Sequence, residues 1–198
     1  MMRFAVLLVV AMTTVAAAQD IVDGGVMGFY FSDTVFIQET TDCRASFDSH
    51  TFLDGYIVLL GSPAPSVGGY EVAIRLLTYG GPPVWAVFAG GPNGWLNFGG
   101  DLSNFLVRYD TPVPCDANGS VVLGYLTMLV QNQSVDITFG PAFPSWAPGP
   151  AVLSADLETV FACELTIGGH EGTVAYINGP GWVPAGRTTL SAVKGMFH

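Results

Sequence analysis

Residues 55–76, GYIVLLGSPAPSVGGYEVAIRL, decide how the chain is divided. An apolar run, Gly55 to Leu60, leads into a centre rich in Ser, Pro and Gly. In the run that follows, every second position is a large apolar residue: Tyr70, Val72, Ile74 and Leu76. This two-residue period indicates a strand with one buried face and one wetter face.

The centre of the stretch, SPAPSVGG at residues 62–69, is either a linker between two domains or a connection within one sheet system. Few short strands precede it, and so few strands rarely form an independent core. We therefore predict a connection within one sheet system. Pro63 and Pro65 stiffen it and cannot donate to a ladder. Gly68 and Gly69 are expected to supply positive φ.

The same period recurs along the chain, whereas helical periods are nearly absent. Clusters of Gly, Pro, Asn and Asp separate the runs, which predicts an all-β, antiparallel β-sandwich of about nine strands. Residues 187–198 do not show this two-residue period. Leu190, Val193 and Phe197 fall on one helical face there and predict a short C-terminal helix. The predicted strands are residues 28–32, 56–60, 70–76, 84–89, 105–109, 121–130, 135–139, 157–165 and 172–177.

The first residues have the layout of a secretory signal peptide. A positive head, Met1-Met2-Arg3, precedes the apolar run 4–12 and the small residues Ala16 to Ala18. The apolar run is shorter than the roughly 20 residues of a membrane-spanning helix. We expect a signal peptide at 1–18, a β-sandwich domain at 19–186 and a tail at 187–198. The protein is then secreted or at the cell surface, with no helical membrane span.

Composition excludes several classes of protein. Half of the 198 residues are hydrophobic and 11% are charged, which argues against disorder. A net charge of −10 with scattered cations argues against nucleic acid as a partner. The mean hydropathy of +0.47 is high for a free soluble protein and indicates a buried interface, such as self-association.

Cysteine usage fits an oxidising compartment. Cys43, Cys115 and Cys163 are odd in number, so the simplest expectation is one disulfide and one thiol, with the pairing open. No two cysteines are close in sequence and no His is beside one, so no metal site is expected. No cofactor is expected either.

Several stretches resemble known proteins. Residues 55–76 and the later apolar run VVLGYLTMLV at 121–130 resemble the strand pattern of cohesin-type and immunoglobulin-like sandwiches. The leader, MGFYFSD at 27–33 and TFGPAFPSWAPGPAVL at 138–153 are similar to a group of uncharacterised secreted bacterial β-sandwich proteins. The tail departs from that group, which more often has Trp, Gly and Leu-Tyr-Arg where this chain has Leu190, Ser191 and residues 196–198. The resemblance implies a fold and an exported location.

No catalytic constellation is found, since the chain has neither GxSxG nor HExxH. Trp95, Phe98, Trp146 and Trp182 lie in Gly- and Pro-rich loops. Rings exposed on a sandwich anchor protein partners or stack on sugars. The other interpretation is that these rings cover the ends of the core.

The sequence therefore predicts a secreted, non-catalytic binding or structural module that acts by surface contact. Its expected partner is another protein or a second copy of the chain, with a glycan as a further possibility. The alternatives are an outer-membrane β-barrel and a glycan-binding or hydrolytic sandwich domain.

Overall fold

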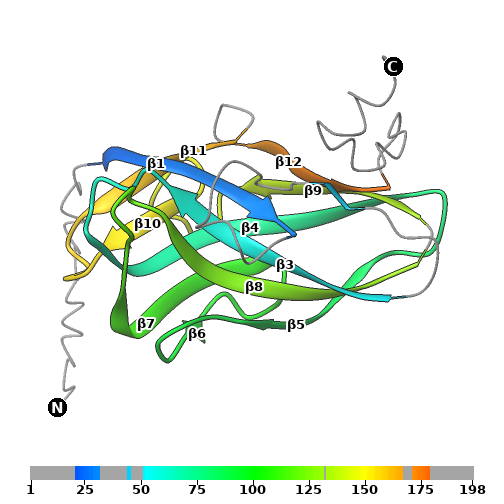
Figure 1. The fold of residues 1–198 in the computed structure, drawn as a ribbon, viewed down its shortest axis with the longest axis horizontal. Coiled ribbons are helices and arrows are strands. Elements are labelled where there is room, and N and C mark those ends of the chain that lie inside the picture. Colours follow the sequence, from blue (N-terminus) through cyan, green and yellow to red (C-terminus); the bar gives the residue numbers. More distant parts are fainter. Residues whose placement is uncertain (1–20, 32–43, 46–50, 132, 167–170, 179–198) are drawn as a thin grey trace, which may run out of the picture.

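The computed structural model describes residues 21–31, 44–45, 51–131, 133–166 and 171–178, and these form an all-β fold (Figure 1). The strands are β1 (Ile21–Tyr30), β2 (Arg44–Ala45), β3 (Thr51–Leu60), β4 (Ser66–Tyr79), β5 (Trp85–Gly90), β6 (Leu96–Asn97), β7 (Asn104–Pro114), β8 (Val121–Val130), β9 (Ser134–Gly140), β10 (Ala151–Ser154), β11 (Val160–Leu165) and β12 (Gly172–Ile177).

The strands pair in the order β2-β12-β9-β4-β10-β11-β1-β3-β8-β5, and β7 pairs with β4 and β6. The sheet curls over so that β1, β3, β8 and β5 face β12, β9, β4 and β7 (Figure 1). The predicted β-sandwich is confirmed. It is not wholly antiparallel, because β1 pairs with β11 and β12 pairs with β2 in parallel.

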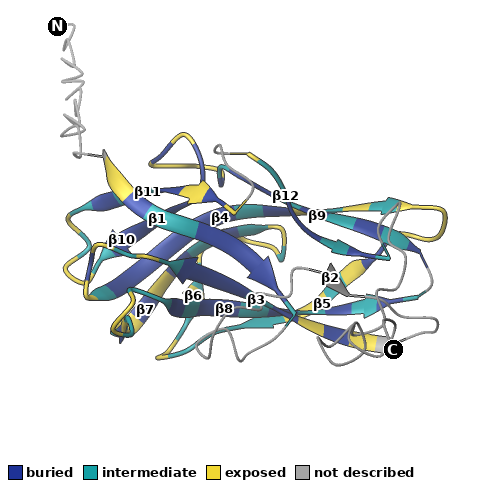
Figure 2. Ribbon diagram, turned by 45° about the horizontal axis from the view of Figure 1, so that its top comes forward, coloured by how far each residue is buried: buried dark blue, intermediate teal, exposed yellow. Residues whose placement is uncertain are grey.

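The core fills the space between the two layers. The ring of Phe29 in β1 meets that of Phe139 in β9 edge to face, with centroids 6.1 Å apart. The hydroxyl of Tyr109 in β7 donates to the carbonyl oxygen of Leu123 in β8 at 2.5 Å. Buried residues gather on the long central strands, whereas β5 has three exposed and three half-buried residues (Figure 2). Burial of these apolar side chains is the main stabilising contribution to such a fold.

The connection between residues 60 and 66, which was predicted to lie within one sheet system, joins β3 in one layer to β4 in the other. It is fixed in place, since the amide of Ser62 donates to the carbonyl of Gly119 at 2.8 Å and the amide of Cys115 donates to that of Pro65 at 2.9 Å. The prediction about its glycines was wrong. Positive φ occurs at Gly61, with φ 68°, while Gly68 and Gly69 lie inside β4.

Other boundaries also differ from the sequence prediction. β10 was missed, because its four residues follow a proline-rich loop and show no period. Leu157 was predicted in a strand, but it lies in a turn where its amide donates to the carbonyl of Ser154. The predicted helix in 187–198 lies outside the described residues. Among those described, no helix is long and apolar enough to cross a membrane.

The expected disulfide is not formed by the described cysteines, because Cys115 and Cys163 are both thiols. Cys163 is buried in β11 and Cys115 follows β7, where the amide of Cys115 is tied to Pro65. Cys43 lies outside the described residues. Burial raises the pKa of the Cys163 thiol to about 12, so it remains protonated at neutral pH.

Candidate functional site

An apolar groove of about 380 Å³ crosses the outer face of the sheet formed by β10, β4, β7 and β6. We call it the β6–β10 groove. Phe98 is 68% exposed and Trp146 is 52% exposed, so both rings are presented to solvent. The groove is lined by Phe98, Leu106, Val107, Arg108, Trp146, Leu153 and Leu157.

Strand register places these residues together. In one row, Leu153 lies opposite Gly69, Gly69 opposite Arg108, and Arg108 opposite Leu96. In the next row, Ala151 lies opposite Glu71 and Glu71 opposite Leu106, whose carbonyl accepts from the amide of Phe98 at 2.9 Å. Successive side chains of a strand point to opposite faces, so both rows lie on the outer face.

The floor of the groove is low because β4 carries Gly68 and Gly69 there. A Cβ at Gly69 would lie 2.3 Å from the carbonyl oxygen of Val107, and one at Gly68 would lie 2.4 Å from that of Ser154. Real Cβ atoms do not approach backbone oxygens so closely. The glycines thus let β7 and β10 close on β4 and leave space above the strand.

One wall of the groove is held by Glu71, a fully buried carboxylate in β4. Its Oε1 accepts from the hydroxyl of Ser145 at 2.7 Å and from the amides of Trp146 and Ala147, each at 3.0 Å. Burial raises the pKa of Glu71 above its ordinary value, and these donors lower it by less. The buried carboxylate therefore fixes the proline loop that carries Trp146.

The opposite wall is supplied by a strained turn. Leu157 has φ 63°, a left-handed conformation that a branched side chain rarely adopts. Its Cδ2 lies 2.7 Å from the Cβ position that Gly68 lacks, so the side chain rests over the glycine. The oxygens of Ser154 and Asp156 hold the turn by accepting from the amides of Thr159 and Glu158. Such outliers are found preferentially at binding sites.

The structure brings together two of the residues singled out from the sequence, Phe98 and Trp146. Trp95 lies elsewhere, because its indole N–H donates to the hydroxyl of Tyr70 at 3.1 Å and its ring packs on Phe105. Trp182 lies outside the described residues. Leu106, Arg108, Leu153 and Leu157 were missed, since only pairing across β4 makes them neighbours.

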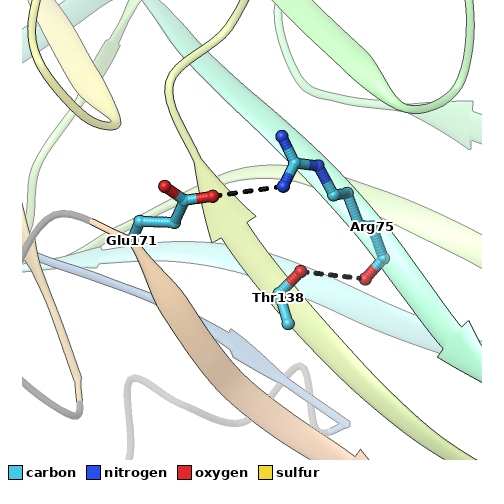
Figure 3. A network of polar contacts seen from close by, with 3 residues as sticks. All are labelled: Arg75, Thr138 and Glu171. Carbon is cyan, nitrogen blue, oxygen red and sulfur yellow. Dashed lines mark hydrogen bonds and ion pairs between the residues drawn. The ribbon is translucent and has the colours of Figure 1, made fainter.

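Further along the same sheet, polar residues make only a surface network (Figure 3). The Arg75 guanidinium forms an ion pair with Glu171 at 3.1 Å, and the Thr138 hydroxyl donates to the carbonyl of Arg75 at 3.4 Å. Exposed pairs of this kind stabilise by at most about 1 kcal/mol. Within the described ranges, no group of three or more His, Cys, Asp or Glu residues is arranged to hold a metal ion.

Comparison with known proteins gives fold-level likenesses. No protein-family model matches the chain, and no curated protein matches it. It is similar to the sixth cohesin of scaffoldin B from Acetivibrio cellulolyticus, solved in complex with a mutant Cel5 dockerin. The identity is 9%, the match covers 79% of this chain and 99% of that chain, and the TM-score is 0.44.

It is also similar to the seventh ScaB type I cohesin from Pseudobacteroides cellulosolvens. That match has 10% identity, covers 72% of this chain and 91% of that chain, and has a TM-score of 0.39. Both structures are cohesin domains.

Proposed function

We propose that this chain is a secreted, non-catalytic protein-binding module, and that the β6–β10 groove holds an extended apolar segment of its partner. The observation that carries the proposal is the exposure of Phe98 and Trp146 in one groove whose floor is lowered by Gly69. Exposed aromatic anchors around an apolar depression are typical of protein interfaces.

The chemistry of the lining favours a protein segment over a glycan. Of the seven lining residues, only Arg108 and the indole N–H of Trp146 offer polar side-chain groups. A sugar needs many hydrogen bonds to replace its water, and this groove offers few. Among the described residues, the one ion pair joins Arg75 to Glu171, so the Arg108 guanidinium is available to a carboxylate. The preferred segment therefore combines apolar side chains with an acidic one.

Selection from a displayed library of random peptides tests this proposal. We expect the wild-type chain to enrich peptides with apolar and acidic residues, and the Phe98→Ala/Trp146→Ala variant to bind those peptides at least about tenfold more weakly, since aromatic anchors each contribute roughly 1–2 kcal/mol or more.

The matched control is Phe143→Ala, because Phe143 is 86% exposed but does not line the groove. It should leave the affinity unchanged. Enriched peptides that bind the double variant as tightly as the wild type would refute the assignment of the groove. No enrichment at all would refute peptide binding as the function.

A further inference from the structure

A second apolar surface lies on the other layer of the sandwich, on the outer face of β3, β8 and β5. Register places Phe52 opposite Leu129 and Leu129 opposite Trp85 in one row. Asp54, Thr127 and Phe88 form the next row, followed by Tyr56 and Tyr125. We call Phe52, Tyr56, Trp85, Phe88, Tyr125 and Leu129 the aromatic face.

The aromatic face is unusually apolar for a surface. Trp85 and Phe52 are each 68% exposed and Phe88 is 54% exposed. The ring of Tyr125 joins the rows, since its centroid lies 5.7 Å from that of Phe88 and 6.5 Å from that of Tyr56. Asp54 is the one charged residue in the three strands, and it accepts a hydrogen bond from the hydroxyl of Thr127 at 2.5 Å.

A hollow adjoins this face. Gly91, Pro92 and Val122 line it together with Tyr125, and its volume is about 510 Å³. A patch of exposed aromatic rings beside a hollow is a typical docking surface.

The last described residues leave the sandwich at the same end as the Phe52–Leu129–Trp85 row. The side-chain amide of Asn178, just after β12, donates to the carbonyl of Gln133 at 3.2 Å. Gln133 is 1% exposed, and it links the end of β12 to the end of β8 and to the segment before β5. Its Oε1 accepts from the amide of Gln131, just after β8, and its Nε2 donates to the carbonyl of Pro82, shortly before β5.

The chemistry of residues 179–198 complements the face. The segment carries Trp182, Leu190, Val193, Met196 and Phe197, together with Arg187, Lys194 and His198, and it has no Asp or Glu. A cationic apolar segment suits an aromatic surface whose single charge is Asp54, because cations are attracted both to carboxylates and to ring faces.

Length also permits the contact. The ten residues of β3 span about 33 Å. The twenty residues after Asn178 reach about 60 Å when extended and about 30 Å as a helix. Either conformation lets the segment turn at Asn178 and run along the face.

We propose that the segment 179–198 of the chain docks on the aromatic face of its own sandwich, with Lys194 or Arg187 near Asp54. The proposal is independent of the β6–β10 groove, which lies on the opposite layer. It explains why an acidic chain gathers cationic and apolar residues, without Asp or Glu, in 179–198 and carries an almost uncharged aromatic face on one layer.

Hydroxyl-radical footprinting of the full chain tests the contact. We compare the wild type with Val193→Asp/Phe197→Asp at low micromolar concentration. If docking lowers the exposed fraction of Trp85 from 68% to roughly 20%, Trp85 should be oxidised about threefold faster in the variant than in the wild type. Phe143 lies outside the aromatic face and should oxidise equally in both, and far-UV circular dichroism checks the fold.

Limited trypsin digestion gives a reciprocal test, because Arg187 and Lys194 are cleavage sites. Substituting the face with Trp85→Ser/Phe88→Ser should expose both sites and speed cleavage several-fold. The matched control Phe143→Ser should not.

Equal footprints in wild type and tail variant, or equal cleavage rates, would overturn the proposal. Protection of Trp85 that rises with protein concentration would place the segment on a second copy and would also overturn the intramolecular contact.

Discussion

Glu71 gives the sharpest test of how the groove is built. Replacing it with Leu leaves the amide of Trp146 without an acceptor, whereas the Ser145 hydroxyl keeps the carbonyl of Ala147 and the amide of Ala147 keeps the Ser145 hydroxyl. A buried donor without a partner costs about 1–3 kcal/mol, and donors on one loop are not additive. We expect Glu71→Leu to lower the free energy of unfolding by about 2–3 kcal/mol and, at about 2–4 °C per kcal/mol, to lower Tm by about 5–10 °C.

Glu71→Gln separates geometry from charge. Only Oε1 serves all three donors, while Oε2 accepts from the Trp146 amide alone, at 3.1 Å. A glutamine oxygen in the Oε1 position keeps an acceptor for the three donors, but the side chain loses its charge and turns an NH₂ group toward Trp146. Because burial disfavours the charged form of Glu71 by more than its donors favour it, removal of the charge is not itself costly, and the NH₂ group that faces the Trp146 amide accounts for an expected loss of about 1 kcal/mol.

Urea unfolding at pH 7, followed by circular dichroism, measures both losses. The control is Glu164→Gln on the exposed side of β11, which should change stability by less than about 0.5 kcal/mol. Equal losses for Leu and Gln would show that charge, rather than the placement of an acceptor, holds the loop. Wild-type stability in Glu71→Leu would refute the role of the carboxylate altogether.

Four further outcomes are expected. Burial raises the folded-state pKa of Glu71 above its ordinary value of 4.5, so above that pH the folded protein binds more protons than the unfolded chain. The stability of the wild type relative to Glu71→Gln should therefore fall as pH rises from about 4.5 toward 7. A rise, measured by urea unfolding across that range, would contradict this. Gly69→Ala should destabilise the fold by about 2 kcal/mol or more in the same assay and abolish groove binding, because its Cβ meets the backbone of Val107; unchanged stability would mean that β7 can move away. Trp95→Phe should cost about 1–3 kcal/mol by removing the donor to the buried hydroxyl of Tyr70, and a neutral result would show that this hydroxyl finds another partner. Native Cys163 should resist iodoacetamide at pH 8 and react only in urea, as peptide mass spectrometry can show, whereas rapid native alkylation would contradict its burial in β11.

Local sequence was sufficient to locate most strands of this protein. The alternation of Tyr70, Val72, Ile74 and Leu76 predicted β4, and the run 121–130 predicted β8 with its observed bounds. These patterns are readable because a strand with a buried face must repeat every second residue. The proline-rich stretch from Gly140 to Pro150 was predicted as a loop, since Pro cannot take part in a central ladder, and the structure differs only at Gly140, which ends β9.

Tertiary pairing alone decided the groove. Gly68 and Gly69 look like turn residues in the sequence, and only the closeness of Val107 and Ser154 shows that they are strand residues that make room. Leu157 looks like the start of an alternating run, but the turn after β10 sets it at positive φ.

The sequence by itself thus determined the class of fold, most of its strands and the choice of Phe98 and Trp146 as candidate contacts. Tertiary structure decided that these two rings share one groove, and that Phe52 and Trp85 flank Leu129 on the opposite layer. The physical reason is that periodicity is local, whereas register comes from hydrogen bonds between strands far apart in the chain, and a shift of one residue would turn every side chain to the other face.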